Sequence, residues 1–303
     1  MAISRAQLVK ELEPGLNALF GLEYKRYDNQ HAEIYTTESS DRAFEEEVML
    51  SGFANAQVKG EGAGVSFDEA QETFTARYSH ETVALAFAIT EEAIEDNLYD
   101  RISSRYTKAL ARSMSNAKQV KSVEPLINGL PSTATFKSGD GVALFSTAHP
   151  TVAGTFKNTL TTQADLNETS LEQSLIDIAA MTDERGLRIA ARGVKMIIPS
   201  ELQFTAERLM KSQGRTATAD NDINAIVSMG MIPQGYRVNN YLTDSDAFYI
   251  ITDVPNGMKM FQRAPLKTAM EGDFDTGNVR YKARERYSFG VSDYRGIFGV
   301  EGA

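Results

Sequence analysis

The feature that most constrains the fold is a strand that leads directly into a long helix, between residues 83 and 121. Val83, Leu85, Phe87 and Ile89 alternate with alanines, and this period of two predicts a β-strand with small residues on its second face. Thr90 follows as a predicted N-cap, and apolar residues then recur every three or four positions. The pattern predicts a helix over about 90–121, which makes a rod of about 45 Å at about 1.5 Å per residue.

The charges of this predicted helix are ordered along it, with the acidic residues first and the basic residues after them, as the helix dipole favours. Four basic residues form a helix stripe beside the apolar face, at spacings of 4, 3 and 4: Arg101, Arg105, Lys108 and Arg112. A solvated face is the simplest interpretation of such a stripe. Pairing with an acidic surface on another copy of the chain and contact with DNA are the alternatives, and the net charge of −10 favours the former.

A second basic surface is predicted near the C-terminus. From 279 to 291 the odd positions are largely apolar, whereas the even positions carry four basic residues: Arg280, Lys282, Arg284 and Arg286. This alternation predicts a long strand with one apolar face and one basic face. We expect the basic face to meet other copies of the chain.

Residues 43–82 predict an extended hairpin. Phe74, Ala76 and Tyr78 alternate with polar residues, and Val65 and Phe67 continue the same period upstream. Gly60, Gly62 and Gly64 precede a strand-like stretch rather than a helix, which argues against a phosphate-binding loop. The hairpin also carries an acidic run that is either a solvated face or a partner for a basic surface on a neighbour: Glu45, Glu46 and Glu47.

The rest of the chain predicts shorter elements. Residues 3–20 predict an amphipathic helix that Pro14 interrupts or restarts, and residues 21–42 predict a polar arm that lies on another surface. Residues 129–168, rich in Gly, Pro, Ser and Thr, predict loops, and an alternating α/β stretch follows. A turn at Pro255, Asn256 and Gly257 predicts that 258–261 pairs back onto the strand at 247–252.

Composition excludes several classes of site. The chain of 303 residues has no cysteine and only three histidines, far apart in sequence, so thiolate and multi-histidine metal sites are not expected. Neither a signal peptide nor an apolar run of membrane-spanning length is visible, and no cofactor is expected. The acidic balance, with a pI of about 5.0, disfavours a dedicated nucleic-acid binder.

Ser146 and His149 are the one pair that could suggest a hydrolase. A nucleophilic serine of that kind lies on a tight turn flanked by glycines, and neither neighbour of Ser146 is glycine. A hydrogen-bonded loop is therefore the favoured interpretation, and we expect no catalytic residue.

The order of these elements resembles the Hong Kong 97-type major capsid fold of tailed bacteriophages, an α+β fold. A closer resemblance is to the major head subunit family of Mu-like phages. It rests on the run from Phe145 to Pro150, Phe-Ser-Thr-Ala-His-Pro, that follows Gly139, Asp140 and Gly141. The strand at 87–90 leading into residues 91–97 is similar to that family's entry to its long helix.

The resemblance implies a division of the chain into named parts. These are an N-terminal arm (1–42), an E-loop hairpin (43–82), a first part of the P-domain (83–140) with the spine helix (about 90–121), an A-domain (141–254), and a second part of the P-domain with the long C-terminal strand (255–303). The E-loop would lie over a neighbouring subunit, with burial of Phe67, Phe74 and Tyr78 there as the expectation from their apolar character.

The resemblance also implies function and partners. Many copies would form hexamers and pentamers of an icosahedral shell around double-stranded DNA, in a virion assembled in the host bacterial cytoplasm. Because only about 40 residues precede the hairpin, a separate scaffolding protein is expected. A portal, non-specific contact with packaged DNA and, in some relatives, a decoration protein complete the partners, with no membrane. An encapsulin-like nanocompartment shell and a hydrolase remain the alternatives.

Overall fold

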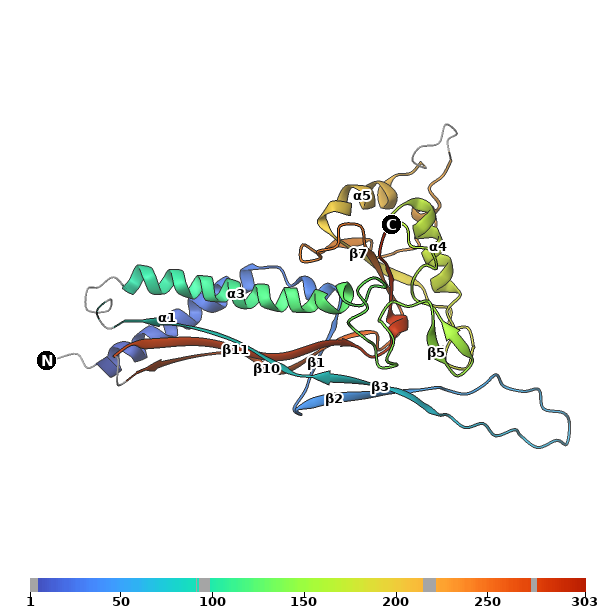
Figure 1. Cartoon of the computed structure of the whole chain (residues 1–303), viewed down its shortest axis with the longest axis horizontal. Helices are drawn as coiled ribbons and strands as arrows, with labels where there is room; N and C mark the ends of the chain where they lie inside the picture. Colours follow the sequence, from blue (N-terminus) through green and yellow to red (C-terminus); the bar gives the residue numbers. More distant parts are fainter. Residues whose placement is uncertain (1–4, 91, 93–98, 215–221, 274–276) are drawn as a thin grey trace.

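The computed structural model describes residues 5–90, 92, 99–214, 222–273 and 277–303, and of 5–12 and 99–102 it describes the backbone alone (Figure 1). The helices, with 3-10 turns written η, are α1 (Arg5–Arg26), η1 (Gln30–Glu33), α3 (Tyr99–Ile127), α4 (Glu168–Ala179), η2 (Ser200–Leu202), α5 (Gln203–Lys211), α6 (Ala225–Ser228) and η3 (Tyr294–Gly296). The strands are β1 (Thr36–Ser39), β2 (Phe44–Leu50), β3 (Glu72–Ser79), β4 (Glu81–Ile89), β5 (His149–Thr151), β6 (Gly154–Phe156), β7 (Gly193–Ile198), β8 (Tyr236–Val238), β9 (Phe248–Thr252), β10 (Met258–Gly272), β11 (Val279–Val291) and β12 (Ile297–Val300).

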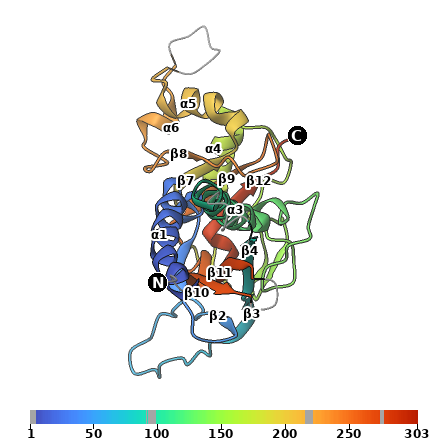
Figure 2. The same cartoon turned by 90° about the vertical axis from the view of Figure 1, so that its left-hand side faces the viewer.

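A long, narrow sheet forms one half of the molecule. Its order is β1-β10-β11-β4, with β1 parallel to β10 and the other pairs antiparallel. Helices α1 and α3 lie along one face of this first sheet (Figures 1 and 2). Their apolar side chains pack onto it in one cluster that includes Phe20, Met114 and Tyr281. No helix of the described residues lies on the opposite face (Figure 2).

The predicted alternation of the last long strand is confirmed in β11. Val279, Tyr281 and Ala283 are buried beneath the helices, while the residues between them are exposed. One side of the strand therefore packs into the core beneath the helices, and the other side is a charged, exposed surface.

One acidic residue, Glu285, lies on the buried side of β11. Its Oε1 accepts a hydrogen bond of 2.6 Å from the Lys118 amine of α3, and its Oε2 accepts one of 3.2 Å from the hydroxyl of Tyr24 in α1. The pair is nearly fully buried, with the two side chains 9% and 2% exposed. The carboxylate thus ties both helices to the sheet, because an unpaired charge in that position would be strongly unfavourable.

A second sheet, in the order β12-β9-β7-β8, stands at one end of the first sheet. Helices α4 and α5 pack around it and share its core, which includes Leu171, Ile197 and Phe248. The predicted pairing of 258–261 with the strand at 247–252 is wrong, because β9 pairs with β7 and β12 while β10 belongs to the first sheet. Strand β12 also joins this sheet, although residues 255–303 were expected to lie together with the first.

The N-terminal segment does not behave as a free arm. Helix α1 passes through Pro14 and continues to Arg26, since Leu16 and Phe20 pack into the core beneath α3. Farther on, β1 pairs with β10, and the buried Tyr35 hydroxyl donates to the Ser122 carbonyl oxygen at 2.6 Å. This segment therefore finds its apolar contacts within its own chain.

Helix α3 ends at Ile127, six residues later than the predicted end, because Val123 and Leu126 still face the core. Thr90, its predicted N-cap, is described, but Glu91, Glu95 and Asp96 of its predicted first turns lie in 91 and 93–98, outside the described part of the chain. No helix among the described residues is both long and apolar enough to cross a bilayer.

Strands β2 and β3 form the predicted hairpin, which extends past the second sheet at one end of the molecule (Figure 1). The hairpin loop, residues 51–71, contains no strand, so the strand-like stretch expected at Val65 and Phe67 is not formed within the chain. Nothing in the described chain pairs with this stretch, and a single extended segment is not stable as a strand without a partner.

We predict that Lys118→Met destabilises the folded chain by about 3–5 kcal/mol, because it leaves the Glu285 carboxylate buried and without its cation. Lys121→Met on the same helix is the matched control. Lys121 pairs with Glu81, whose side chain is 62% exposed, so its loss should cost under about 1 kcal/mol. Urea unfolding of the unassembled chain measures both changes, and equal effects would contradict the role assigned to Glu285.

Candidate functional site

His149 lies at the start of β5 and is fully buried. Its Nδ1 is 2.6 Å from Asp140 Oδ2, and its Nε2 is 3.1 Å from Asn158 Oδ1 and 3.2 Å from the Leu144 carbonyl oxygen. The Ser146 hydroxyl oxygen instead accepts a hydrogen bond from the backbone N–H of Ala148. The imidazole is therefore engaged elsewhere and is not placed to take a proton from Ser146, as a serine hydrolase requires.

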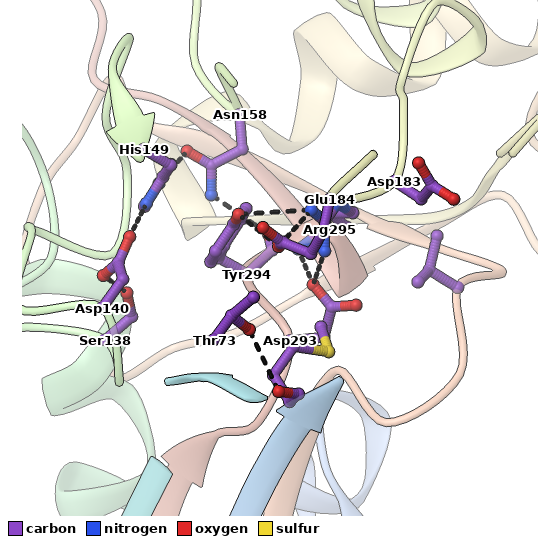
Figure 3. Close-up of polar contacts among 12 residues, drawn as sticks. Thr73, Ser138, Asp140, His149, Asn158, Asp183, Glu184, Asp293, Tyr294 and Arg295 are labelled. Carbon is purple, nitrogen blue, oxygen red and sulfur yellow. Dashed lines mark hydrogen bonds and ion pairs between the residues drawn. The ribbon is translucent and has the colours of Figure 1, made fainter. Parts of the chain in front are cut away.

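Both nitrogens of His149 face acceptors. The orientation of the Asn158 amide is fixed, because its Oδ1 accepts from the Ser146 backbone N–H and its Nδ2 donates to the carbonyl oxygens of Leu144 and Tyr294. The ring is thus held between a carboxylate oxygen at Nδ1 and amide and carbonyl oxygens at Nε2. It also stacks on the ring of Tyr294, with the two ring centroids 4.0 Å apart (Figure 3).

Arg295, next to Tyr294 in η3, is the second buried charge of this region. Its guanidinium donates to Glu184 at 2.5 Å, to Asp293 at 3.3 Å and to the Thr182 carbonyl oxygen at 2.9 Å. The Tyr294 hydroxyl donates to the same Glu184 carboxylate at 3.1 Å. Arg295, Glu184, Tyr294, Asn158, His149 and Asp140 are called the junction below, because they connect the end of β11 to the loops around the second sheet (Figure 3).

The junction also supports the base of the hairpin. Phe74 of β3 stacks on Tyr294 with ring centroids 5.7 Å apart. Beside it, the Thr73 hydroxyl donates to the Met49 carbonyl oxygen of β2; Figure 3 labels Thr73 and Tyr294. Gly139 lies against the same strand, where a Cβ would come within 3.0 Å of the backbone of Thr75 and Ala76. The direction in which the hairpin leaves the body is thus set by packing at the junction.

Three aromatic residues were expected to be buried on a neighbouring copy, and of these only Phe67 is exposed on the surface of its own chain. Phe67, in the hairpin loop, is 98% exposed. Tyr78 is buried against Phe261, and its hydroxyl is hydrogen-bonded to Ser292, while Phe74 packs on Tyr294. Tyr78 and Phe74 therefore find their contacts inside the chain, because β3 crosses the end of β11 before the hairpin projects.

The acidic run of β2 does not form one surface, because alternate residues of a strand point to opposite sides. Glu45 accepts a hydrogen bond from Ser40, and Glu47 pairs with the Lys259 amine at 2.6 Å, so both are engaged by their own chain. Glu46 points outward and is 3.7 Å from Arg77. Of the three residues in this run, only Glu46 is exposed where a neighbouring copy could contact it, as expected for the whole run.

The residues of the two predicted basic surfaces are largely exposed. Arg105, Lys108 and Arg112 of the helix stripe form no ion pair with the described residues, and the side chain of Arg101 lies outside them. On β11, Arg280 pairs with Asp273, while Arg286 is half-buried. We use the name basic face for a group on the helix-free side of the first sheet: Lys267, Arg280, Lys282 and Arg284.

Within the basic face, Lys267 of β10 stands directly opposite Arg284 of β11 in the sheet register. Like charges in directly opposed positions destabilise a sheet. An anionic group placed over the basic face would reduce this repulsion. Elsewhere in the described chain, no three acidic or histidine side chains converge as metal ligands.

Sequence reasoning missed the junction. Asp140 and His149 stand in the short run that carries the resemblance, but nothing in their spacing indicates that they form a buried pair. Arg295 and Glu184 are separated by more than a hundred residues, and only the fold brings them together.

We predict that Asp140→Asn destabilises the chain by about 1.5–3 kcal/mol at neutral pH, because it removes the charged acceptor that holds the buried ring of His149. Burial raises the pKa of the Asp140 carboxyl, but hydrogen bonds from His149 and Ser138 outweigh it and hold the pKa below its ordinary value. The carboxylate therefore contributes stability above about pH 4, and this contribution disappears as the pH falls through the lowered pKa. Thermal unfolding from pH 7 to pH 3 should show the difference from wild type shrinking. The exposed Asp41→Asn serves as control.

Comparison with solved structures shows the fold. The capsid of Myoviridae phage XM1 is similar with a TM-score of 0.53 and 11% identity over 89% of each chain. The capsid of an empty GTA particle is similar with a TM-score of 0.52 and 15% identity, over 90% of this chain and 89% of the other. A virus-like particle from Pyrococcus furiosus is similar with a TM-score of 0.52 and 11% identity, over 94% of this chain and 98% of the other. The α+β Hong Kong 97-type capsid fold expected from the sequence is thereby confirmed.

The sequence itself carries a more specific match, although no curated protein matches the chain. Residues 72–300 match the family described as phage capsid protein. This match includes β3, the long helix, the second sheet, three of the four strands of the first sheet and the junction. Since it spans well over half of the sequence, the chain belongs to the phage capsid protein family.

Proposed function

We propose that this chain is a major capsid protein whose copies form the hexamers and pentamers of an icosahedral shell around double-stranded DNA. The observation that carries the proposal is the hairpin loop. It extends beyond the body of the molecule, and there Val58 is 100% and Phe67 98% exposed. Apolar side chains held away from their own core are characteristic of an interface with another subunit.

The segments take the following roles in this proposal. Residues 43–82 lie over a neighbouring subunit, and the second sheet with its helices, within 141–254 and joined by β12, surrounds the axis of each capsomer. The first sheet and α3, from 83–140 and most of 255–303, connect capsomers. Residues 1–42 serve as an arm in so far as they are not already packed on their own chain.

Several partners follow from a capsid role. We expect a separate scaffolding protein, a portal, non-specific contact with packaged DNA and, in some particles, a decoration protein. The subunit would act without catalysis in a virion assembled in the bacterial cytoplasm. Similarity of the run from Phe145 to Pro150 to the Mu-like head subunits supports that branch of the family.

The charges of the chain support contacts between copies. The net charge is −10, yet the basic face and the helix stripe both gather positive charge, of which Arg280 alone is paired with an acidic residue of the described chain. The hairpin loop contains three acidic residues, Glu61, Asp68 and Glu69, against the single base Lys59. Opposite charges on two faces of one molecule favour association of each copy with the next.

The direct test is assembly. The purified chain, alone and with its scaffolding protein, should form closed shells of uniform size in negative-stain electron microscopy, with matching light scattering. A chain that stays monomeric in both preparations would contradict the proposal.

We predict that two charge-reversal variants, Arg105→Glu/Arg112→Glu and Lys282→Glu/Arg284→Glu, abolish shells without unfolding the subunit. Both pairs are solvent-exposed in the free chain, so the circular dichroism and melting temperature of the monomer should stay close to wild type. Normal shells that package less DNA would instead assign the reversed surface to DNA.

An encapsulin-like nanocompartment shell is the second candidate, because the fold is also similar to that of the virus-like particle from Pyrococcus furiosus. The contents of particles from the native host decide between them: nuclease-protected DNA supports the capsid, and a packaged enzyme supports the compartment. For the hydrolase alternative, wild type and Ser146→Ala are compared in esterase assays, and equal activity removes it.

A further inference from the structure

Strand β4 leaves one edge of the first sheet open. It pairs with β11 over nine residues, from Glu81 to Ile89, and with no other strand in the described chain. Its sequence has no proline and no lysine, and its register shows no bulge. At the opposite edge, β1 covers only residues 259–262 of β10, and the rest of β10 has Pro265 and two shifts of register, features that protect an edge. A long, regular and unprotected edge is a template for another strand.

The core beside this edge is incompletely covered. On the helix side, Leu85 of β4 is 46% exposed and Tyr106 of α3 is 51% exposed. The ring centroids of Phe87 and Tyr106 are 5.8 Å apart. On the other side, the exposed alanines of β4 stand in front of the basic residues of β11. A strand added here would need apolar residues on one side, small or polar residues on the other, and negative charge nearby.

Residues 64–67 of the hairpin loop have this pattern. Val65 and Phe67, both largely exposed, alternate with Gly64 and Ser66. No hydrogen bond from the described residues reaches the backbone of 64–67. The acidic residues of the hairpin loop, Glu61, Asp68 and Glu69, lie on both sides of this stretch.

The two features cannot meet within one molecule. Figure 1 shows the hairpin loop at one end of the long axis and the far end of β4 and β11 at the other. A contact between them therefore joins different copies head to tail. Repetition of a head-to-tail contact closes into rings when the rotation permits.

We propose that residues 64–67 of one copy add as a fifth strand to the free edge of β4 in the next copy. Val65 and Phe67 then cover Leu85 and Tyr106, and the neighbouring acidic residues come close to the basic face. The proposal rests on the capsid role, since it names the contact by which one subunit receives the hairpin of another.

Because the chain has no cysteine, introduced pairs test the contact without background. Ser66→Cys is combined in turn with Ala84→Cys, Ala86→Cys and Ala88→Cys, which sample the register along the exposed side of β4. In assembled shells, oxidation or a short bismaleimide should link subunits into covalent oligomers on non-reducing gels for at least one pair. Dilute monomers should not cross-link, and neither should Val58→Cys paired with the same alanine positions.

Shells that form normally but give no cross-link with any Ser66 pair, while their cysteines react with a maleimide dye, would overturn the strand addition and leave the capsid role intact. Absence of shells from the wild-type chain would overturn the capsid role itself. As an independent readout, Phe67→Ser should lower the yield of shells more than Val58→Ser does, and neither exposed change should alter the melting temperature of the monomer. Equal yields would count against the contact.

Discussion

Strand β11 is the element on which the rest of the structure depends. Its buried side forms the floor under α1 and α3, its two edges pair with β10 and β4, and its C-terminal end leads into the junction. A strict period of two satisfies all of these demands at once. A shift of one residue would bring the arginines under the helices and the tyrosines into water, so the register is held by the cost of burying charge.

The buried charges divide their work between the two halves of the molecule. Glu285 and Lys118 connect helices to the first sheet, whereas in the junction the contacts of His149 with Asp140 and of Arg295 with Glu184 join loops around the second sheet. Buried ion pairs add little net stability compared with apolar packing, but they are strongly directional. In the junction they fix how the second sheet and the hairpin are oriented on the end of the first.

Sequence patterns predicted the elements whose surroundings repeat along the chain. The alternation of 279–291 and of 83–89 reports a sheet with two different faces, and the three- and four-residue spacing of α3 reports a helix on that sheet. The pairing of β10 was not predictable in the same way, because the turn at Asn256 is equally compatible with a hairpin and with a change of sheet. The change of sheet depends on the close approach of Gly257 to Gly296. A Cβ at position 257 would lie 2.7 Å from the Cα of Gly296. The junction was not predicted for a related reason. Its charged residues come singly from segments distant in the sequence, so no periodic pattern indicates them.

The order of strands in the first sheet has a consequence for biosynthesis. Its outer strands, β1 and β4, precede α3 in the sequence, while the two strands between them, β10 and β11, follow nearly all of the second sheet and are made much later. On the ribosome, α3 and the hairpin strands therefore emerge before the sheet that supports them can exist. Pairings so distant in sequence form slowly, and they make folding of this half a late event. A subunit presents a finished surface on this sheet only after β11 has been made, which separates synthesis of its first strands from shell growth in time.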